Sequence, residues 1–235
     1  MRKIIVTTFL TMDGVLQAPG GPEEDTTNGF KWGGWQFGYS DELTKNALTK
    51  IMSEPFDLLL GRRTYEIFAA YWPYNSDNPI GERFNQINKY VVATTPIDTS
   101  WAHSTLISKD VVNELKKLKE QDGPNLLVHG SGGLAQTLFA NQLVDVLYTW
   151  IYPITLGKGK KLFADGTAAQ QWKMTESGIS TTGVIVARYE PDGEVRVGSF
   201  VSNEVSEQEM ERRKKWKKEE VRDHIDPVYY QKLVQ

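Results

Sequence analysis

Short β-branched or leucine-rich runs alternate along this chain with stretches whose apolar residues recur every three or four positions. The short runs predict buried strands at 3–10, 57–60, 90–94, 105–107, 125–128 and 145–154. The periodic stretches predict helices at 40–52, 62–70, 110–121 and 132–141. Alternating strands and helices are typical of a mainly parallel sheet that helices cover on both faces.

The alternation stops after Lys161. The segments 173–179 and 183–189 have no helix between them, which predicts an antiparallel pair at one edge of the sheet. From Asn203 onward acidic and basic residues dominate, which favours a solvent-exposed helix. We therefore expect two parts: a folded domain over 1–202 and a charged helical extension over 203–235.

Composition and charge exclude several classes of function. The chain has no Cys, so it holds no disulfide and no thiolate metal site, and its three His lack the spacing of metal ligands. A net charge of −3 gives no general attraction to nucleic acid or to membranes. Threonines interrupt the first apolar run, which favours a buried strand over a signal peptide. We expect a cytoplasmic protein with no metal, nucleic-acid or membrane partner.

Two junctions share one form, a buried strand that ends at Gly and opens directly into a helix: 58–66 (LLLGRRTYE) and 126–136 (LLVHGSGGLAQ). Free backbone N–H groups at a helix start attract phosphate, and Arg62 and Arg63 add fixed positive charge at the first junction. Simple turn chemistry explains either junction alone. Two of them at the carboxyl ends of one sheet indicate a dinucleotide site.

Four segments carry a resemblance to a known family: 4–16, 58–68, 90–96 and 126–163. Through them the chain resembles the dihydrofolate reductase superfamily, in the branch similar to the reductase domain of the bacterial riboflavin-biosynthesis enzyme. The resemblance implies a three-layer α/β fold with a mixed, mostly parallel sheet of eight strands and antiparallel C-terminal strands. It also implies NADPH as the hydride donor and a homodimer.

The resemblance assigns cofactor contacts by position. It implies contacts to the nicotinamide from Phe9 and Leu16, to the adenosine-side phosphates from Gly61, Arg62, Arg63 and Thr64, to the adenine from Thr94, Thr95 and Ser108, and to the pyrophosphate and ribose from Gly130, Ser131, Gly132, Gly133 and Leu134. The two arginines favour NADPH over NADH, because a 2′-phosphate needs positive partners.

A hydride transfer also needs a proton, and the source is open. Dihydrofolate reductases hold their active-site carboxyl on the helix before the strand that ends here at Gly61, but that position is occupied by Lys45. Asp13 and Asp41 are the candidate catalytic acids. A turn residue and a helix cap are the alternative interpretations of these two, and water could deliver the proton without either.

Aromatic residues suggest where a substrate would bind. Trp32, Trp35 and Phe37 lie in the long loop 13–39, where they could stack on a planar ring or, alternatively, form a cluster that pins the loop. Tyr152 ends a strand and could reach the substrate.

We therefore expect an NADPH-dependent reductase of a small heterocyclic substrate, most specifically the reductase half of the riboflavin enzyme, which acts on 5-amino-6-(5-phosphoribosylamino)uracil. The alternatives are a non-catalytic nucleotide-binding or assembly module and a genuine dihydrofolate reductase.

Overall fold

A computed structural model describes residues 1–200 and 205–225, and it divides the chain into two units, Met1–Val195 and Arg196–Gln235. The expected boundary between 202 and 203 lies outside the described residues. The second unit holds the charged helix α6 (Glu207–Ile225), in which Glu209 pairs with Arg212 and Arg213. Every helix in the described ranges is too short or too polar to cross a membrane.

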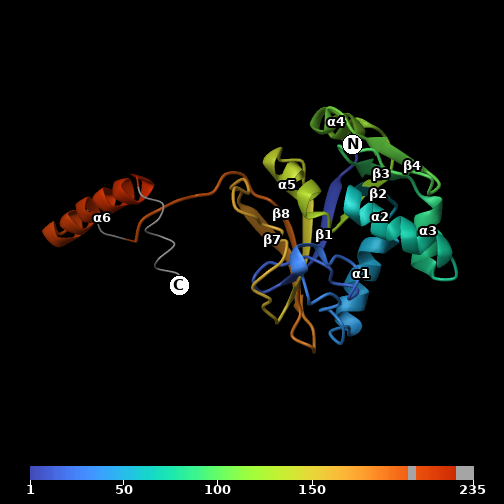
Figure 1. Cartoon of the computed structure of the whole chain (residues 1–235), viewed down its shortest axis with the longest axis horizontal. Helices are drawn as coiled ribbons and strands as arrows, with labels where there is room; N and C mark the ends of the chain where they lie inside the picture. Colours follow the sequence, from blue (N-terminus) through green and yellow to red (C-terminus); the bar gives the residue numbers. More distant parts are fainter. Residues whose placement is uncertain (201–204, 226–235) are drawn as a thin grey trace. The chain divides into compact units, whose positions relative to one another are not determined.

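The first unit is built on one sheet of eight strands (Figure 1). They are β1 (Ile4–Thr11), β2 (Phe56–Gly61), β3 (Lys89–Val92), β4 (Ser104–Ile107), β5 (Asn125–His129), β6 (Val146–Tyr152), β7 (Trp172–Ile179) and β8 (Ile185–Pro191). Their order is β4-β3-β2-β5-β1-β6-β8-β7, and β8 pairs antiparallel with both β6 and β7 while the other pairs are parallel. The predicted mixed, mostly parallel sheet is confirmed.

Helices cover both faces of this sheet. They are α1 (Glu42–Ser53), α2 (Arg62–Tyr71), α3 (Pro79–Gln86), α4 (Val111–Glu120) and α5 (Gly132–Ala140), with short 3-10 turns η1 (Thr27–Gly29) and η2 (Trp72–Tyr74). Side chains alternate along β2, so Leu58 and Leu60 pack in the core with α1, α2 and α3. Leu59 points the other way and packs in the core with α4 and α5. Two apolar cores therefore sandwich the sheet.

Helix α3 was not expected from the sequence. Its start carries a recognisable signal, because Asn78 caps the helix by accepting from the Ile80 N–H at 2.9 Å, and Pro79 occupies the first helical position. The helix is only eight residues long, which is too short for a clear apolar period. Its Phe84 is buried and belongs to the lining of the candidate site described below.

A buried ion pair fixes the start of β1 to β2. The Arg2 guanidinium donates to the Asp57 carboxylate at 2.5 Å and to the Pro124 carbonyl at 2.6 Å, and both charged side chains are almost inaccessible to solvent. Asp57 also accepts from the backbone N–H of Asn88 at 3.1 Å. These contacts satisfy both charges, which is the condition for tolerating them inside a protein.

Replacing Asp57 by Ala should lower the free energy of unfolding by about 3–5 kcal/mol, because it leaves the Arg2 charge buried without a partner. Glu114→Ala, which removes an exposed ion pair with Lys117, should cost about 0–1 kcal/mol. Urea denaturation of the two variants measures both values. A loss for Asp57→Ala no larger than that of the exposed pair would contradict the assigned role.

Candidate functional site

A large cavity of the first unit opens where the parallel strands end. Its volume is about 1650 Å³, above the roughly 300–1,000 Å³ typical of a pocket for one small ligand. Strand-end residues contribute to its lining: Thr7, Thr8, Phe9, Gly61, Val92, His129 and Trp150. Ligands of open α/β sheets bind in this place, because the helices that follow the strands begin there.

The two glycine junctions predicted from the sequence meet at this cavity, since β2 and β5 are neighbours in the sheet. The Ser131 hydroxyl joins them: it accepts from the Gly61 N–H at 2.9 Å and donates to Thr64 Oγ1 at 2.7 Å. A Cβ at Gly61 would approach Ser131 Oγ to 3.0 Å, so the absence of a side chain permits the contact. We call residues 61–64 and 130–134 the glycine wall of the cavity.

The glycine wall has the chemistry of an anion site. Helices α2 and α5 both begin there, neither has a side-chain cap, and neither carries an acid in its first turn. A Cβ built on Gly130 or on Gly133 would meet no atom within 4 Å, so both positions face open space inside the cavity lining. Uncapped helix starts and a clear approach to the main chain suit a pyrophosphate. The residues therefore fit the dinucleotide that the sequence suggested.

Basic side chains line the same cavity, and carboxylates already pair with three of them, Arg62, Arg63 and Lys160. Arg62 pairs with Glu66 at 2.9 Å. Arg63 lies 3.3 Å from Asp25, and Lys160 pairs with the other oxygen of the same carboxylate. Desolvation acts to raise the pKa of Asp25, yet hydrogen bonds from Lys160 and Thr27 hold it below its usual value. Asp25 therefore has two cationic partners, one on α2 and one after β6.

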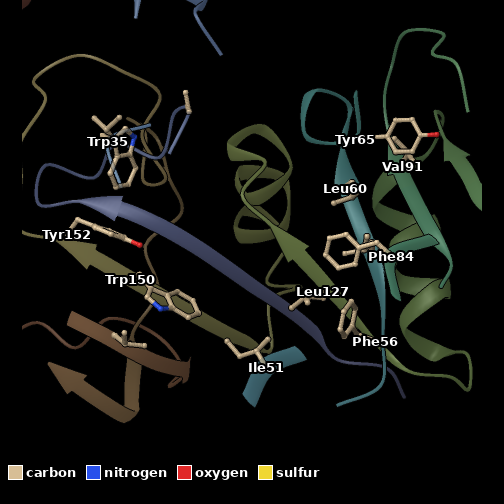
Figure 2. Packing of buried hydrophobic residues seen from close by; sticks show 14 of the residues in the cluster. Trp35, Ile51, Phe56, Leu60, Tyr65, Phe84, Val91, Leu127, Trp150 and Tyr152 are labelled. Atoms are coloured by element: carbon tan, nitrogen blue, oxygen red, sulfur yellow. The ribbon is translucent and has the colours of Figure 1, made fainter. Parts of the chain in front are cut away.

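Another part of the lining is apolar, and its residues lie far apart in the sequence. We call this set the apolar wall: Leu48, Met52, Phe68, Trp72, Ile80, Phe84 and Trp150. Figure 2 shows Trp150 on the β6 side of the sheet and Phe84 on the β2 side. Helix α1 contributes only Leu48 and Met52, whereas Lys45, which precedes them on the same face of that helix, is exposed and lies outside the lining. The wall therefore offers flat apolar surface without a carboxylate from α1.

Asp13 lies outside the lining and holds a turn together. Its carboxylate accepts from Thr11 Oγ1 at 2.6 Å and from the backbone N–H groups of Leu156 and Gly157 at 3.2 and 2.8 Å. Desolvation acts to raise the pKa of Asp13, but these hydrogen bonds hold it below its ordinary value. In this structure Asp13 ties the end of β1 to the segment after β6.

Asp41 also lies outside the cavity lining and caps α1. It accepts from the Thr44 N–H at 2.9 Å, and its second oxygen accepts from the Thr181 N–H at 2.8 Å. The Thr44 hydrogen bond is the main reason that the pKa of Asp41 falls to about 2, with desolvation opposing it and Thr181 adding to it. A carboxyl group with so low a pKa is ionised at neutral pH, so it has no proton to donate to a substrate.

The four aromatic residues expected at the substrate do not line the cavity. Trp35 is buried, and its indole N–H donates to the Gln17 carbonyl at 2.7 Å, which pins the long loop. Tyr152 is buried edge-on against Trp35 and donates to Gln36 at 3.4 Å. Trp32 packs on Phe30, and Phe37 is 92% exposed. Gln36 and Phe9 are the cavity residues that this aromatic cluster supports.

The expected cofactor residues, in contrast, come together. All of them except Ser108 line the cavity: Phe9, Leu16, Gly61, Arg62, Arg63, Thr64, Thr94, Thr95, Gly130, Ser131, Gly132, Gly133 and Leu134. Ser108 follows β4 and is exposed. The apolar wall was not expected from the sequence, because its residues come from five separate elements with no local motif. Lys160, which is not among the residues expected at the site, also lines the cavity.

His129 ends β5 directly before Gly130 and lines the cavity. Its Nδ1 lies 2.9 Å from Thr7 Oγ1, while Nε2 is buried and has no hydrogen-bond partner. Burial lowers the pKa of His129 to about 4, so the ring is neutral at neutral pH.

Comparison with known families matches the described fold. The model of the family described as RibD C-terminal domain matches residues 2–186, most of the first unit. The uncharacterized protein YyaP of Bacillus subtilis (strain 168) is 24% identical over 200 residues, which cover 82% of this chain and 96% of that protein.

Solved structures share the architecture. A putative riboflavin biosynthesis protein from Shewanella sp. PV-4 superposes with a TM-score of 0.59 at 17% identity, covering 81% of this chain and 99% of the other. Dihydrofolate reductase from Enterococcus faecalis, complexed with NADP(H) and RAB-propyl, superposes with a TM-score of 0.51 at 13% identity, covering 81% and 96%. At these identities the likeness establishes the fold alone.

The lowered pKa of His129 predicts a pH dependence of stability. The unfolded chain takes up a proton near 6.5 and the folded chain only near 4, so stability is lost as pH falls between these values. The slope should reach about 1.4 kcal/mol per pH unit. Urea denaturation of wild type and His129→Gln from pH 7 to 4 should show a shallower decline in the variant. Parallel curves would contradict the neutral, buried ring.

Proposed function

The chain belongs to the family of RibD C-terminal domains, and we propose that it is a reductase that uses NADPH to reduce a small heterocyclic substrate. The observation that carries the proposal is the glycine wall, where two uncapped helix starts and two glycines with open space face one cavity. A cofactor bound there supplies a hydride from its nicotinamide ring. The chain's own residues bind it, orient it and place the second ligand beside it.

The glycine wall would hold the phosphates. The N–H groups at the start of α5 would receive the pyrophosphate, since no side chain caps that turn. Leu16 lies 3.4 Å from where a Cβ of Gly132 would stand, so it closes the cavity beside the glycine turn. Phe9, which packs edge-on against Trp150 and Tyr152, would support the nicotinamide.

Arg62 and Arg63 would select NADPH over NADH. Both line the cavity at the start of α2, about half-exposed, and their ion pairs with Glu66 and Asp25 are of the weak, exchangeable kind. A 2′-phosphate offers a stronger charge-assisted partner than either carboxylate. The arginines can therefore turn to the ligand at small cost.

The apolar wall would receive a flat heterocycle, because the half-buried Phe68, which stacks on the buried Phe84 at 5.7 Å, presents an aromatic surface next to His129. Our most specific proposal is 5-amino-6-(5-phosphoribosylamino)uracil, with Lys161 of the same lining available to its phosphate. Dihydrofolate is less favoured, because α1 brings Leu48 and Met52 to the cavity and no acid.

We infer that water delivers the proton. The carboxylates of Asp13 and Asp41 accept structural hydrogen bonds, and both residues lie outside the cavity lining. Consumption of NADPH with the pyrimidine or with dihydrofolate distinguishes the two substrates. Binding without consumption would favour the alternative of a nucleotide-binding module. The homodimer and the cytoplasmic location expected from the sequence stay predictions.

Gly133→Ala should weaken NADPH binding by about tenfold or more, which is about 1.4 kcal/mol, because the new methyl group occupies the space of the ligand. Stability should change by less than about 0.5 kcal/mol, since that methyl meets no protein atom within 4 Å. Gly198→Ala, which also adds a methyl in open space but in the second unit, is the matched control. Calorimetric titration measures the affinities, and an unchanged affinity for Gly133→Ala would refute the glycine wall as the cofactor site.

Arg62→Ala and Arg63→Ala should each weaken NADPH by about 1–3 kcal/mol and leave NADH nearly unaffected, because only NADPH carries the 2′-phosphate. Arg212→Ala, which removes an arginine paired with Glu209 in α6, serves as the control. Equal losses for the two cofactors would remove the arginines from the 2′-phosphate site. The same titrations with NADPH and NADH give the answer.

A further inference from the structure

The Nε2 atom of His129 is a buried polar atom without a hydrogen-bond partner. Within the described residues, only this nitrogen and Thr149 Oγ1 are buried side-chain polar atoms without a hydrogen bond. Buried polar groups are almost always satisfied in folded proteins, so such an exception calls for a physical explanation. His129 lines the cavity directly beside Gly130, and a bound molecule could supply the missing partner.

The hydrogen-bond network around Thr7 indicates which partner is missing. Thr7 Oγ1 lies 3.1 Å from the Val128 carbonyl and 2.9 Å from His129 Nδ1, and a hydroxyl has a single hydrogen to give. In the arrangement in which that hydrogen goes to the Val128 carbonyl, Thr7 accepts from Nδ1, and Nδ1 carries the proton of the ring. A neutral imidazole holds one N–H, so Nε2 is left with a lone pair. The vacant position needs a donor.

We propose that His129 is a specificity-determining residue whose Nε2 accepts a hydrogen bond from an N–H or O–H on the uncharged, planar ring of a ligand. The inference rests on the proposed function. It requires the substrate to turn an edge with an N–H or O–H donor toward Nε2. Its surroundings agree: the Phe68 and Phe84 rings each lie 6.2 Å from the imidazole, and neither offers a charge. A site built to receive a donor rejects analogues that lack it, because its acceptor would then stay buried and unpaired.

The first test reads the tautomer in the full chain without any ligand. Only three histidines are present, so a long-range ¹H–¹⁵N spectrum of histidine-labelled protein, with His129→Gln for assignment, resolves the ring nitrogens of His129. We expect a protonated Nδ1 and an unprotonated Nε2 at neutral pH. A proton on Nε2, or on both nitrogens, would overturn the proposal.

The second test uses lumazine and 1,3-dimethyllumazine, two planar probes that differ by replacement of ring N–H with N–CH₃. Fluorescence titrations at a pH where lumazine is uncharged, with and without NADPH, should show wild type preferring lumazine by about tenfold or more. His129→Phe should lose this preference, and His129→Gln, whose amide oxygen also accepts, should keep part of it. The exposed His103→Gln should behave as wild type.

The outcomes distinguish failure of the His129 proposal from failure of the proposed cofactor. Equal affinity for the probes in wild type, no binding of lumazine, or the same preference in His129→Phe would overturn the role of His129. A preference that appears in wild type while NADPH fails to bind would instead uphold His129 and refute the proposed cofactor.

Discussion

The cavity depends on one hydroxyl. Ser131 receives the Gly61 N–H and donates to Thr64, and so binds the turn after β2 to the turn after β5. Because these strands are neighbours, a short side chain can span the two turns, and because Gly61 lacks a Cβ, the turns can approach. Both helices then begin at the same place with uncapped N–H groups. Two weak anion sites become one extended surface.

The long loop 13–39 closes the cavity through contacts that reach across the fold. Trp35 is buried and holds Gln17, whose side-chain oxygen accepts from the Lys160 N–H at 3.0 Å. Asp25 pairs with Arg63 of α2 and with Lys160 after β6. Trp35 and Tyr152, which the sequence suggested as substrate contacts, thus support the site without lining it. Asp25 joins the loop to the glycine wall through Arg63.

Much of the fold could be predicted because it rests on local patterns: β2 contains the continuous apolar run 58–60, and both glycine turns stand directly before helices. Most of the residues expected at the cofactor line one cavity for the same reason, since they lie in two short motifs. The apolar wall could not be predicted this way, because its members meet only through the packing of α1, α2, η2, α3 and β6. The state of His129 depends on Thr7 of another strand, which no spacing along the chain reveals.

A titration of the full chain with NADPH, followed by energy transfer from tryptophan to the nicotinamide, tests the central claim most directly. Trp150 and Trp72 both line the cavity, so a bound cofactor lies close to two donors. We expect saturable quenching of tryptophan emission with sensitised NADPH emission. Saturation should need lower concentrations of NADPH than of NADH. Absence of saturable transfer with either nucleotide would mean that the joined glycine turns serve only to build the fold.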